Sequence, residues 1–302
     1  MHLDRAAPRL HRLGRFLTVA GLRGDRRYWA LIERRQPLPS SARLRAGHLS
    51  ATFDLSDPTL GPWVYRGQYE RCSLAAVAGI VRPEWVCLDV GANQGYYTMV
   101  LSSLVGPRGS VVAVEPSAYF TDRLGALATL AGNVVVVDMA LGSEAGPATL
   151  LHEGDALGQS HLATHDEVPE GLRGEAVRMT TLPALIDASG IDHVDFVKID
   201  VEGAETPVLE SLLELERLPK AVLVEVWGRF ATDATRRAMQ AFEARGLAPH
   251  RIGRVQGRVR NHPGVRRVRP DEVGYGAEGN LLLVAPGAVR ETPAGRPLLP
   301  EA

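Results

Sequence analysis

Two acidic residues on either side of a glycine-containing turn are the most informative chemical feature of this sequence. The stretch VCLDVGANQGYYTMVLSSLVGPRGSVVAVEP places Asp89 just before the turn Gly91–Gly95 and Glu115 twenty residues beyond Gly95. The turn differs from the G-x-G-x-x-G pattern of dinucleotide enzymes, and a carboxylate beside it disfavours a pyrophosphate. Asp89 instead suits an amino group, and Glu115 suits two ribose hydroxyls. The segment therefore predicts a nucleoside cofactor with a cationic end, such as S-adenosylmethionine.

Acidic side chains recur where the other strands of the central region are predicted to end. Apolar runs predict strands at 85–89, 110–115, 134–138, 194–200 and 221–227, separated by helical patterns. This alternation predicts a parallel sheet covered by helices on both faces, with the carboxyl ends of the strands at one edge. Taken singly, each acid could be a helix N-cap or a surface residue; together they predict a polar cleft. The residues predicted at this edge are Asp89, Gly91, Glu115, Asp138, Asp200 and Glu225.

A second motif, VDFVKIDVEGAET, alternates charged and apolar residues. If the strand continues through this motif, Lys198, Asp200 and Glu202 point to the same side. A helix is then predicted to begin after Gly203. Glu205 would lie in its first turn, where a carboxylate interacts favourably with the helix dipole. The alternative for Lys198 is a purely structural pairing with a neighbouring acid.

The pattern of elements divides the chain into three predicted parts. Residues 1–60 are predicted to be a basic, partly helical N-terminal extension. Residues 61–288 are predicted to be the main domain. Residues 289–302, which are rich in Pro and Gly, are predicted to be a disordered tail.

Four further segments carry specific structural predictions. One or two helices are predicted between Leu10 and Ile32, and residues 48–55 are predicted to be a strand that pairs with the residues after it. Residues 142–174 are predicted to be a glycine-rich excursion from the sheet. A late strand at 280–284 is predicted to pair with a strand near 251–255.

Composition limits the classes of partner. The net charge of −1 gives no general attraction to nucleic acid or to a membrane. Arginine is nevertheless concentrated at both ends, with eleven in residues 1–45 and seven in residues 250–270. Cys72 and Cys87 lack metal-ligand spacing, and no apolar run is long enough for a membrane span. The sequence therefore predicts a cytoplasmic protein without a membrane span.

The ordered motifs resemble those of the FkbM-type family of class I S-adenosylmethionine-dependent methyltransferases. The resemblance implies an α/β, Rossmann-like fold with a seven-stranded, mostly parallel sheet whose last strands are antiparallel, helices on both faces and an N-terminal extension. The matching stretches are GQYE (67–70), LDVGANQGYYT (88–98), VVAVEPS (111–117), DMALG (138–142), TTLPALI (180–186), VKIDVEGAE (197–205), VLVEVW (222–227) and NLLLV (280–284).

The resemblance also implies which residues contact S-adenosylmethionine. Asp138 would lie near the adenine, and the matched stretches contribute further contacts on either side of the glycine turn. The predicted cofactor-binding residues are Glu70, Asp89, Gly91, Asn93, Gly95, Glu115, Pro116, Asp138 and Met139.

Methyl transfer to an oxygen atom would be assisted by a base close to the acceptor hydroxyl. Asp200 is the first candidate, because it ends a predicted strand beside the expected methyl position, and Glu202 and Glu225 are the next. Lys198 would orient a carboxylate or bind the substrate oxygen. The resemblance implies that the acceptor is a hydroxylated small molecule, such as a sugar, a polyketide or another specialised metabolite.

Several alternatives stay open at this point. No metal is predicted to be required, although Asp138, Asp200 and Glu225 offer the hard oxygen ligands that suit Mg²⁺. Methylation of a nitrogen or a carboxylate on a small molecule is the second enzymatic hypothesis. A cofactor-binding but inactive partner subunit is a third, and docking of the Arg-rich ends on an anionic partner a fourth. Nucleic acid is not predicted as a substrate, because the N-P-P-Y-like motif for exocyclic amines is missing.

Overall fold

The computed structural model describes residues 1–4, 6–22, 24–56, 60–153, 156–163, 168–226, 231–256, 261–273, 279–286 and 288. These residues belong to two compact units. The first comprises residues 1–79 and 252–265, and the second comprises residues 80–251 and 266–288, as far as they are described. The predicted tail, 289–302, lies outside the described residues, as does Trp227 at the end of a matched stretch.

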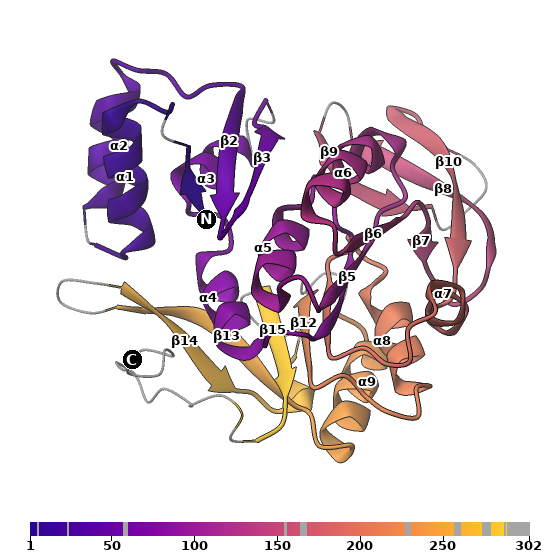
Figure 1. Cartoon of the computed structure of the whole chain (residues 1–302). Coiled ribbons are helices and arrows are strands. Elements are labelled where there is room, and N and C mark those ends of the chain that lie inside the picture. Colours follow the sequence, from indigo (N-terminus) through magenta and orange to yellow (C-terminus); the bar gives the residue numbers. More distant parts are fainter. Residues whose placement is uncertain are drawn as a thin grey trace. The chain divides into compact units, whose positions relative to one another are not determined.

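The largest sheet is mostly parallel (Figure 1), and its strands from β15 to β6 belong to the second unit, whereas parts of β13 and β14 belong to the first. Its strand order is β14-β13-β15-β12-β11-β4-β5-β6. Strand β15 is antiparallel to both β12 and β13, so the predicted pairing of the late strand with the segment near residue 251 is confirmed. The strands are β4 (Val86–Val90), β5 (Ser110–Val114), β6 (Val134–Val137), β11 (Phe196–Ile199), β12 (Ala221–Val226), β13 (Ala248–Gln256), β14 (Asn261–Arg267) and β15 (Gly279–Val284).

The sheet has eight strands in the described part of the chain, where seven were predicted. The additional strand, β14, follows β13 along the chain and lies beside it at the edge of the sheet. Its sequence, NHPGVRR, contains one large apolar residue and a proline, so it lacks the alternation by which a half-buried strand is recognised.

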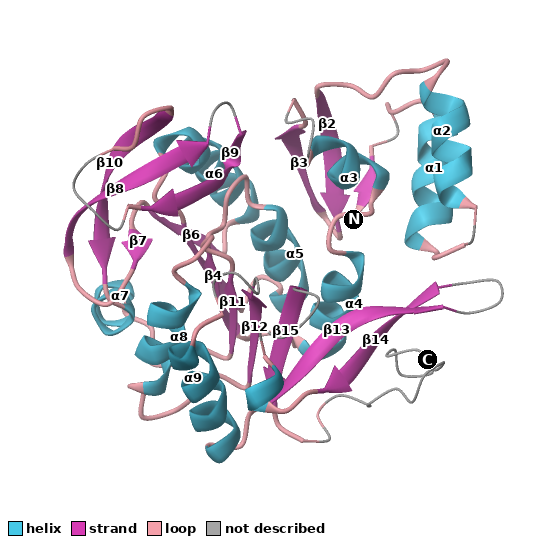
Figure 2. Cartoon of the chain, turned by 180° about the vertical axis from the view of Figure 1, so that it is seen from behind, coloured by secondary structure: helices cyan, strands magenta, loops and turns pink. Residues whose placement is uncertain are grey.

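Helices cover both faces of this sheet, as predicted (Figure 2). Leu88, Val197 and Val222 point to one face and belong to the hydrophobic cluster that includes side chains of α7, α8 and α9. Ala113 points to the opposite face, where it packs with Leu124 of α6. The helices are α5 (Tyr96–Val105), α6 (Ala118–Ala131), α7 (Leu182–Ser189), α8 (Glu205–Leu213) and α9 (Asp233–Ala244).

The segment predicted to be a glycine-rich excursion forms a second, four-stranded sheet. Its order is β7-β10-β8-β9, with β10 antiparallel to β8 over eight residue pairs. The strands were not predicted, because Gly and charged residues interrupt the apolar positions of LRGEAVRMT in β10. The four strands are β7 (Ala140–Leu141), β8 (Gly146–Glu153), β9 (Ala156–Leu162) and β10 (Leu172–Thr180).

The first unit contains the two helices predicted near the N-terminus, together with a three-stranded sheet. The prediction that the strand near residues 48–55 pairs with the residues after it was wrong. Strand β3 pairs instead with the preceding β2, through a tight turn at Gly47, whose φ is +53°. Tyr65 and Trp29 are buried between the helices. The elements are β1 (His2–Leu3), α1 (Arg9–Val19), α2 (Asp25–Glu33), β2 (Ser41–Ala46), β3 (Leu49–Asp54), α3 (Gly61–Arg66) and α4 (Arg71–Ile80).

None of the helices within the described ranges is long and apolar enough to span a bilayer.

Candidate active site

The carboxyl ends of five parallel strands form one edge of the main sheet, as the sequence predicts. Strands β6, β5, β4, β11 and β12 are consecutive neighbours and run in the same direction. Asp89 and Glu225 lie near the ends of β4 and β12, and Gly91, Glu115, Asp138 and Asp200 follow the ends of β4, β5, β6 and β11. The acidic residues therefore lie along one edge of the sheet because of the strand order.

The turn after β4 is tight enough to require glycine at its first position. A Cβ atom on Gly91 would lie 1.8 Å from the backbone oxygen of Asp200, and the φ of Gly91 is +78°. Asn93 also has a left-handed backbone, with φ +52°, which Asn tolerates better than most residues. Gly95 is the N-cap of α5, and a Cβ atom there would lie 2.7 Å from a side-chain carbon of Leu127. Both glycines thus have a packing role in addition to any role in ligand binding.

Glu115 stabilises this turn through its carboxylate. Oε2 accepts a hydrogen bond from the Asn93 backbone N–H at 2.8 Å, and Oε1 accepts one from the Ser117 N–H at 3.0 Å. Glu115 is only 6% exposed. Burial, opposed by the two backbone hydrogen bonds, raises the pKa of Glu115 from 4.5 to about 7. Each carboxylate oxygen retains a further lone pair for a ligand hydroxyl.

The raised pKa of Glu115 predicts a dependence of stability on pH. The folded protein holds this proton more tightly than the unfolded chain, so the contribution is fully present below pH 4.5 and is lost as the pH rises through about 7. The free energy of unfolding is expected to decrease by up to about 3 kcal/mol across this window. Urea denaturation at a series of pH values measures it, with Glu115→Gln expected to lack this component.

The matched control for this measurement is Glu144→Gln, which changes an exposed glutamate of the same unit. Its profile should follow that of the unmodified protein. If Glu115→Gln shows the same pH profile as the unmodified protein, the carboxyl group does not titrate in this range and the interpretation is wrong.

Asp89 lies inside β4 and is fully buried. Its Oδ2 accepts a hydrogen bond from the Thr98 hydroxyl at 2.6 Å, whereas Oδ1 has no hydrogen-bond partner among the described residues. Burial raises the pKa of Asp89, against the opposing effects of the Lys198 ammonium and the Thr98 hydroxyl. A buried carboxylate oxygen without a partner can accept a hydrogen bond from a ligand amine or from water.

Lys198 and Asp200 form an ion pair at the end of β11. Lys198 Nζ lies 2.9 Å from Asp200 Oδ2 and 4.8 Å from the centroid of the Tyr97 ring. The Lys198 side chain is 4% exposed and that of Asp200 is 17% exposed. Lys198 is also paired in register with Asp89 on the neighbouring strand. The pairing of Lys198 with an acid, one of the two alternatives for this residue, is therefore present.

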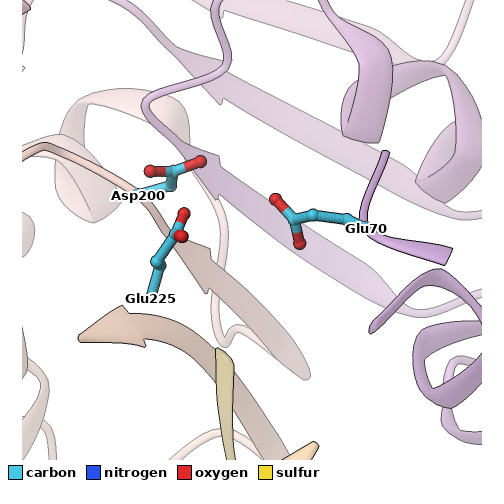
Figure 3. A group of neighbouring side chains, drawn as sticks. All are labelled: Glu70, Asp200 and Glu225. Atoms are coloured by element: carbon cyan, nitrogen blue, oxygen red, sulfur yellow. The ribbon is translucent and has the colours of Figure 1, made fainter. Parts of the chain in front are cut away.

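Glu225, in the adjacent strand β12, lies close to Asp200. The two side chains offer carboxylate oxygens within 4.8 Å of each other, and Figure 3 shows them directed toward each other. Glu70, also drawn there, belongs to the first unit, where it precedes α4 with φ +41°. Two carboxylates from neighbouring strand ends therefore lie at this rim, and one of them, Asp200, is paired with Lys198.

Glu202 does not share the strand geometry expected from the alternation. Strand β11 ends at Ile199, and Glu202 lies in a turn with φ +49°. The chain turns because α8 begins at Glu205, whose buried carboxylate accepts hydrogen bonds from the Gly203 N–H at 2.9 and 3.1 Å. The expectation that Glu202 points to the same side as Lys198 and Asp200 required the strand to continue to Glu202. Because the strand ends at Ile199, this expectation was wrong.

The other predicted residues lie at the outer part of the same edge. Pro116 is half-buried after Glu115, and Met139 is half-buried after β6. Asp138 is exposed and forms an ion pair with Arg178 of β10 at 3.0 Å. Within the described residues, Asp138 is not part of the acidic group around Asp200 and Glu225, so the metal-ligand set considered from the sequence is not brought together.

Sequence reasoning missed Ser117 and Glu175, which contact the Glu115 turn. The Ser117 hydroxyl donates to Glu175 Oε2 at 3.0 Å, and the Ala118 N–H donates to Glu175 Oε1 at 2.8 Å. Glu175 lies in β10, 58 residues beyond Ser117. The only signal in the sequence was the position of Ser117 directly after Glu115-Pro116, because serine is a common helix N-cap residue.

Comparison with known protein families identifies the class of this chain. A family model for the methyltransferase FkbM domain matches residues 89–246, which is more than half of the 302 residues. The chain therefore belongs to the FkbM methyltransferase family and has the class I methyltransferase fold expected from its motifs. The matched region begins at Asp89 and contains Glu115, Lys198, Asp200 and Glu225.

Two curated proteins show similarity to parts of the chain. The AMB antimetabolite synthetase AmbE of Pseudomonas aeruginosa is 29% identical over 203 residues, which are 56% of this chain and 9% of that protein. The methyltransferase sdnD of Sordaria araneosa is 28% identical over 170 residues, 46% of this chain and 65% of that protein. The chain thus spans less than two thirds of the length of either relative.

Solved structures with similar folds are more distant. The FkbM methyltransferase of Methylobacillus flagellatus KT is 15% identical, with a TM-score of 0.38, over 75% of this chain and 55% of that chain. Aeropyrum pernix fibrillarin, in complex with natively bound S-adenosyl-L-methionine, is 13% identical, with a TM-score of 0.40, over 70% of this chain and 73% of that chain.

Proposed function

We propose that this protein is an S-adenosylmethionine-dependent methyltransferase that acts on a hydroxyl group of a small molecule. The observation that carries the proposal is the buried Glu115 carboxylate, which holds the turn between β4 and α5 and keeps a lone pair on each oxygen. A carboxylate at this position can accept hydrogen bonds from both ribose hydroxyls of a nucleoside. Membership in the FkbM methyltransferase family supports the choice of nucleoside.

The residues at this edge fit the two ends of S-adenosylmethionine. At the ribose end, Glu115 would accept the hydroxyl hydrogen bonds, and Asp138 and Met139 would lie near the adenine. At the amino-acid end, the unpartnered Oδ1 of Asp89 would accept a hydrogen bond from the amino group or from a water bound to it. Gly91, Asn93 and Gly95 would bring backbone close to the ligand. Pro116 completes the proposed set at this edge.

The chemistry assigned to this chain is positioning and proton removal. When bound, S-adenosylmethionine supplies a methyl group activated by its sulfonium sulfur. Asp200 would take the proton from the acceptor hydroxyl, while Lys198, 2.9 Å away, keeps the Asp200 carboxylate oriented. Glu225 and Glu202 are the next candidates for the base. Alignment of the acceptor oxygen within this rim would supply a large part of the rate.

The test is the site of methylation on matched acceptors. The purified protein is incubated with methyl-labelled S-adenosylmethionine and acceptors that differ only in carrying a hydroxyl, an amine or a carboxylate, and mass spectrometry with NMR locates the methyl group. Label on oxygen of the hydroxyl acceptors supports the proposal. Label found only on nitrogen would show that the protein is an N-methyltransferase. Label found only on the carboxylate would show that it is a carboxyl methyltransferase. Cofactor binding without transfer to any acceptor class would favour the inactive partner subunit.

A further inference from the structure

A partly buried polar network joins the Glu115 turn to the four-stranded sheet. Ser117 is the centre of this network: its N–H donates to Glu115 Oε1 at 3.0 Å, and its hydroxyl donates to Glu175 Oε2 at 3.0 Å. Ser117 is 1% exposed. Ser117 therefore connects Glu115, which is proposed to bind the ribose, with Glu175 of β10.

Glu175 acts as the N-terminal cap of α6. Ser117 occupies the N-cap position, but its side chain makes no capping hydrogen bond. The first backbone N–H of the helix, that of Ala118, instead donates to Glu175 Oε1 at 2.8 Å. A carboxylate at this end also interacts favourably with the helix dipole. The start of α6 is thus held from a strand distant in the sequence.

His152 fixes Glu175 in turn. Its Nε2 lies 2.9 Å from Glu175 Oε2, and its Nδ1 lies 2.7 Å from the Ser160 hydroxyl oxygen. His152 is fully buried on β8. Burial alone would raise the pKa of Glu175, but the hydrogen bonds from Ala118, Ser117 and His152 outweigh it and lower that pKa. Because an ionised carboxylate only accepts, His152 Nε2 donates to Glu175.

We propose that Glu175, held by His152, is a positioning residue for the nucleoside site. Through Ser117 and the first turn of α6, it fixes the segment that carries Glu115 and so sets the direction of the two oxygens that would meet the ribose hydroxyls. The four-stranded sheet then contributes to the geometry of the proposed cofactor site through Glu175. The inference rests on the proposed function, since it assigns Glu115 to the ribose.

The experiment compares Glu175→Gln with the control Glu144→Gln, an exposed glutamate that precedes β8. In the Glu175→Gln variant the new side chain can still accept from the Ala118 N–H, but its amide nitrogen cannot accept from Ser117 and His152. Binding of S-adenosylhomocysteine and of its 2′,3′-dideoxy analogue is measured by calorimetry. The expected result is an affinity loss of about tenfold for S-adenosylhomocysteine and less than about twofold for the dideoxy analogue. Glu144→Gln should change neither.

A purely structural role would weaken both ligands equally, and that outcome, or no loss at all, would overturn the proposal. Hydrogen exchange of the segment 112–121 without ligand gives an independent readout: faster exchange in Glu175→Gln alone supports the positioning role, and unchanged exchange overturns it. If the unmodified protein binds neither nucleoside, the proposed function fails, and hydrogen exchange still decides whether Glu175 holds the turn.

Discussion

Replacement of Asp200 by Asn is expected to lower the turnover number by about 10²–10⁴-fold, the usual contribution of a general base. The asparagine side chain keeps the size of the aspartate but cannot take a proton from the acceptor hydroxyl. Cofactor affinity should change by less than about threefold, because the lost interaction is made during the reaction. Single-turnover kinetics with an identified acceptor, together with calorimetric titration of S-adenosylmethionine, measure the two quantities separately.

The matched control is Asp187→Asn, which makes the same change at an exposed position of α7. It should leave both turnover and affinity unchanged. Since Asp200 pairs with the buried Lys198, thermal denaturation must show that the Asp200 variant is folded at the assay temperature. Equal losses of turnover and cofactor affinity would contradict the assignment of Asp200 as the base. Glu225 would then be the first candidate for the base.

Replacement of Glu115 by Ala is expected to weaken S-adenosylmethionine binding by about a hundredfold or more, because two hydrogen bonds to a charged group are lost. The change also removes the acceptors of the Asn93 and Ser117 N–H groups, so the turn itself loses support. Glu115→Gln keeps the side-chain size and should fall between the Ala variant and the unmodified protein. Calorimetry of the three proteins at pH 8 gives the series.

The control for this series is Glu144→Ala, an exposed position that should retain full affinity. Affinity in Glu115→Ala equal to that of the unmodified protein would show that the carboxylate does not meet the ribose. A loss that is identical for S-adenosylhomocysteine and for its 2′,3′-dideoxy analogue would attribute the effect to the turn alone.

The central sheet could be predicted from the sequence because its inner strands, such as β5 and β12, are mostly buried on both faces. Val111–Val114 and Val222–Val224 are continuous apolar runs, as parallel strands require, and their ends fell within one or two residues of the prediction. The strands of the four-stranded sheet are partly exposed and carry Gly, Arg and Glu among their apolar residues. Such sequences are compatible with loops, so pattern alone did not identify them.

The site was predictable to the extent that it follows from strand order. Gly91, Asp200 and Glu225 converge because β4, β11 and β12 are neighbours in a parallel sheet. Contacts that depend on a distant segment were not predictable. Glu175 reaches Ser117 only because β10 pairs with β8 and β7, and nothing local to Ser117 indicates this. The expectation that Glu202 shares a side with Lys198 and Asp200 was wrong for a local reason, because the strand ends before it at Ile199.

Calorimetric titration of the purified protein with S-adenosylmethionine and S-adenosylhomocysteine tests the central claim most directly. We expect saturable one-site binding of both ligands with micromolar dissociation constants, as a nucleoside site at the edge formed by Gly91, Glu115 and Asp200 requires. Circular dichroism first shows that the protein is folded, and the titration is run with and without a hydroxylated acceptor. If neither titration gives more heat than dilution, the claim that this chain uses S-adenosylmethionine is contradicted.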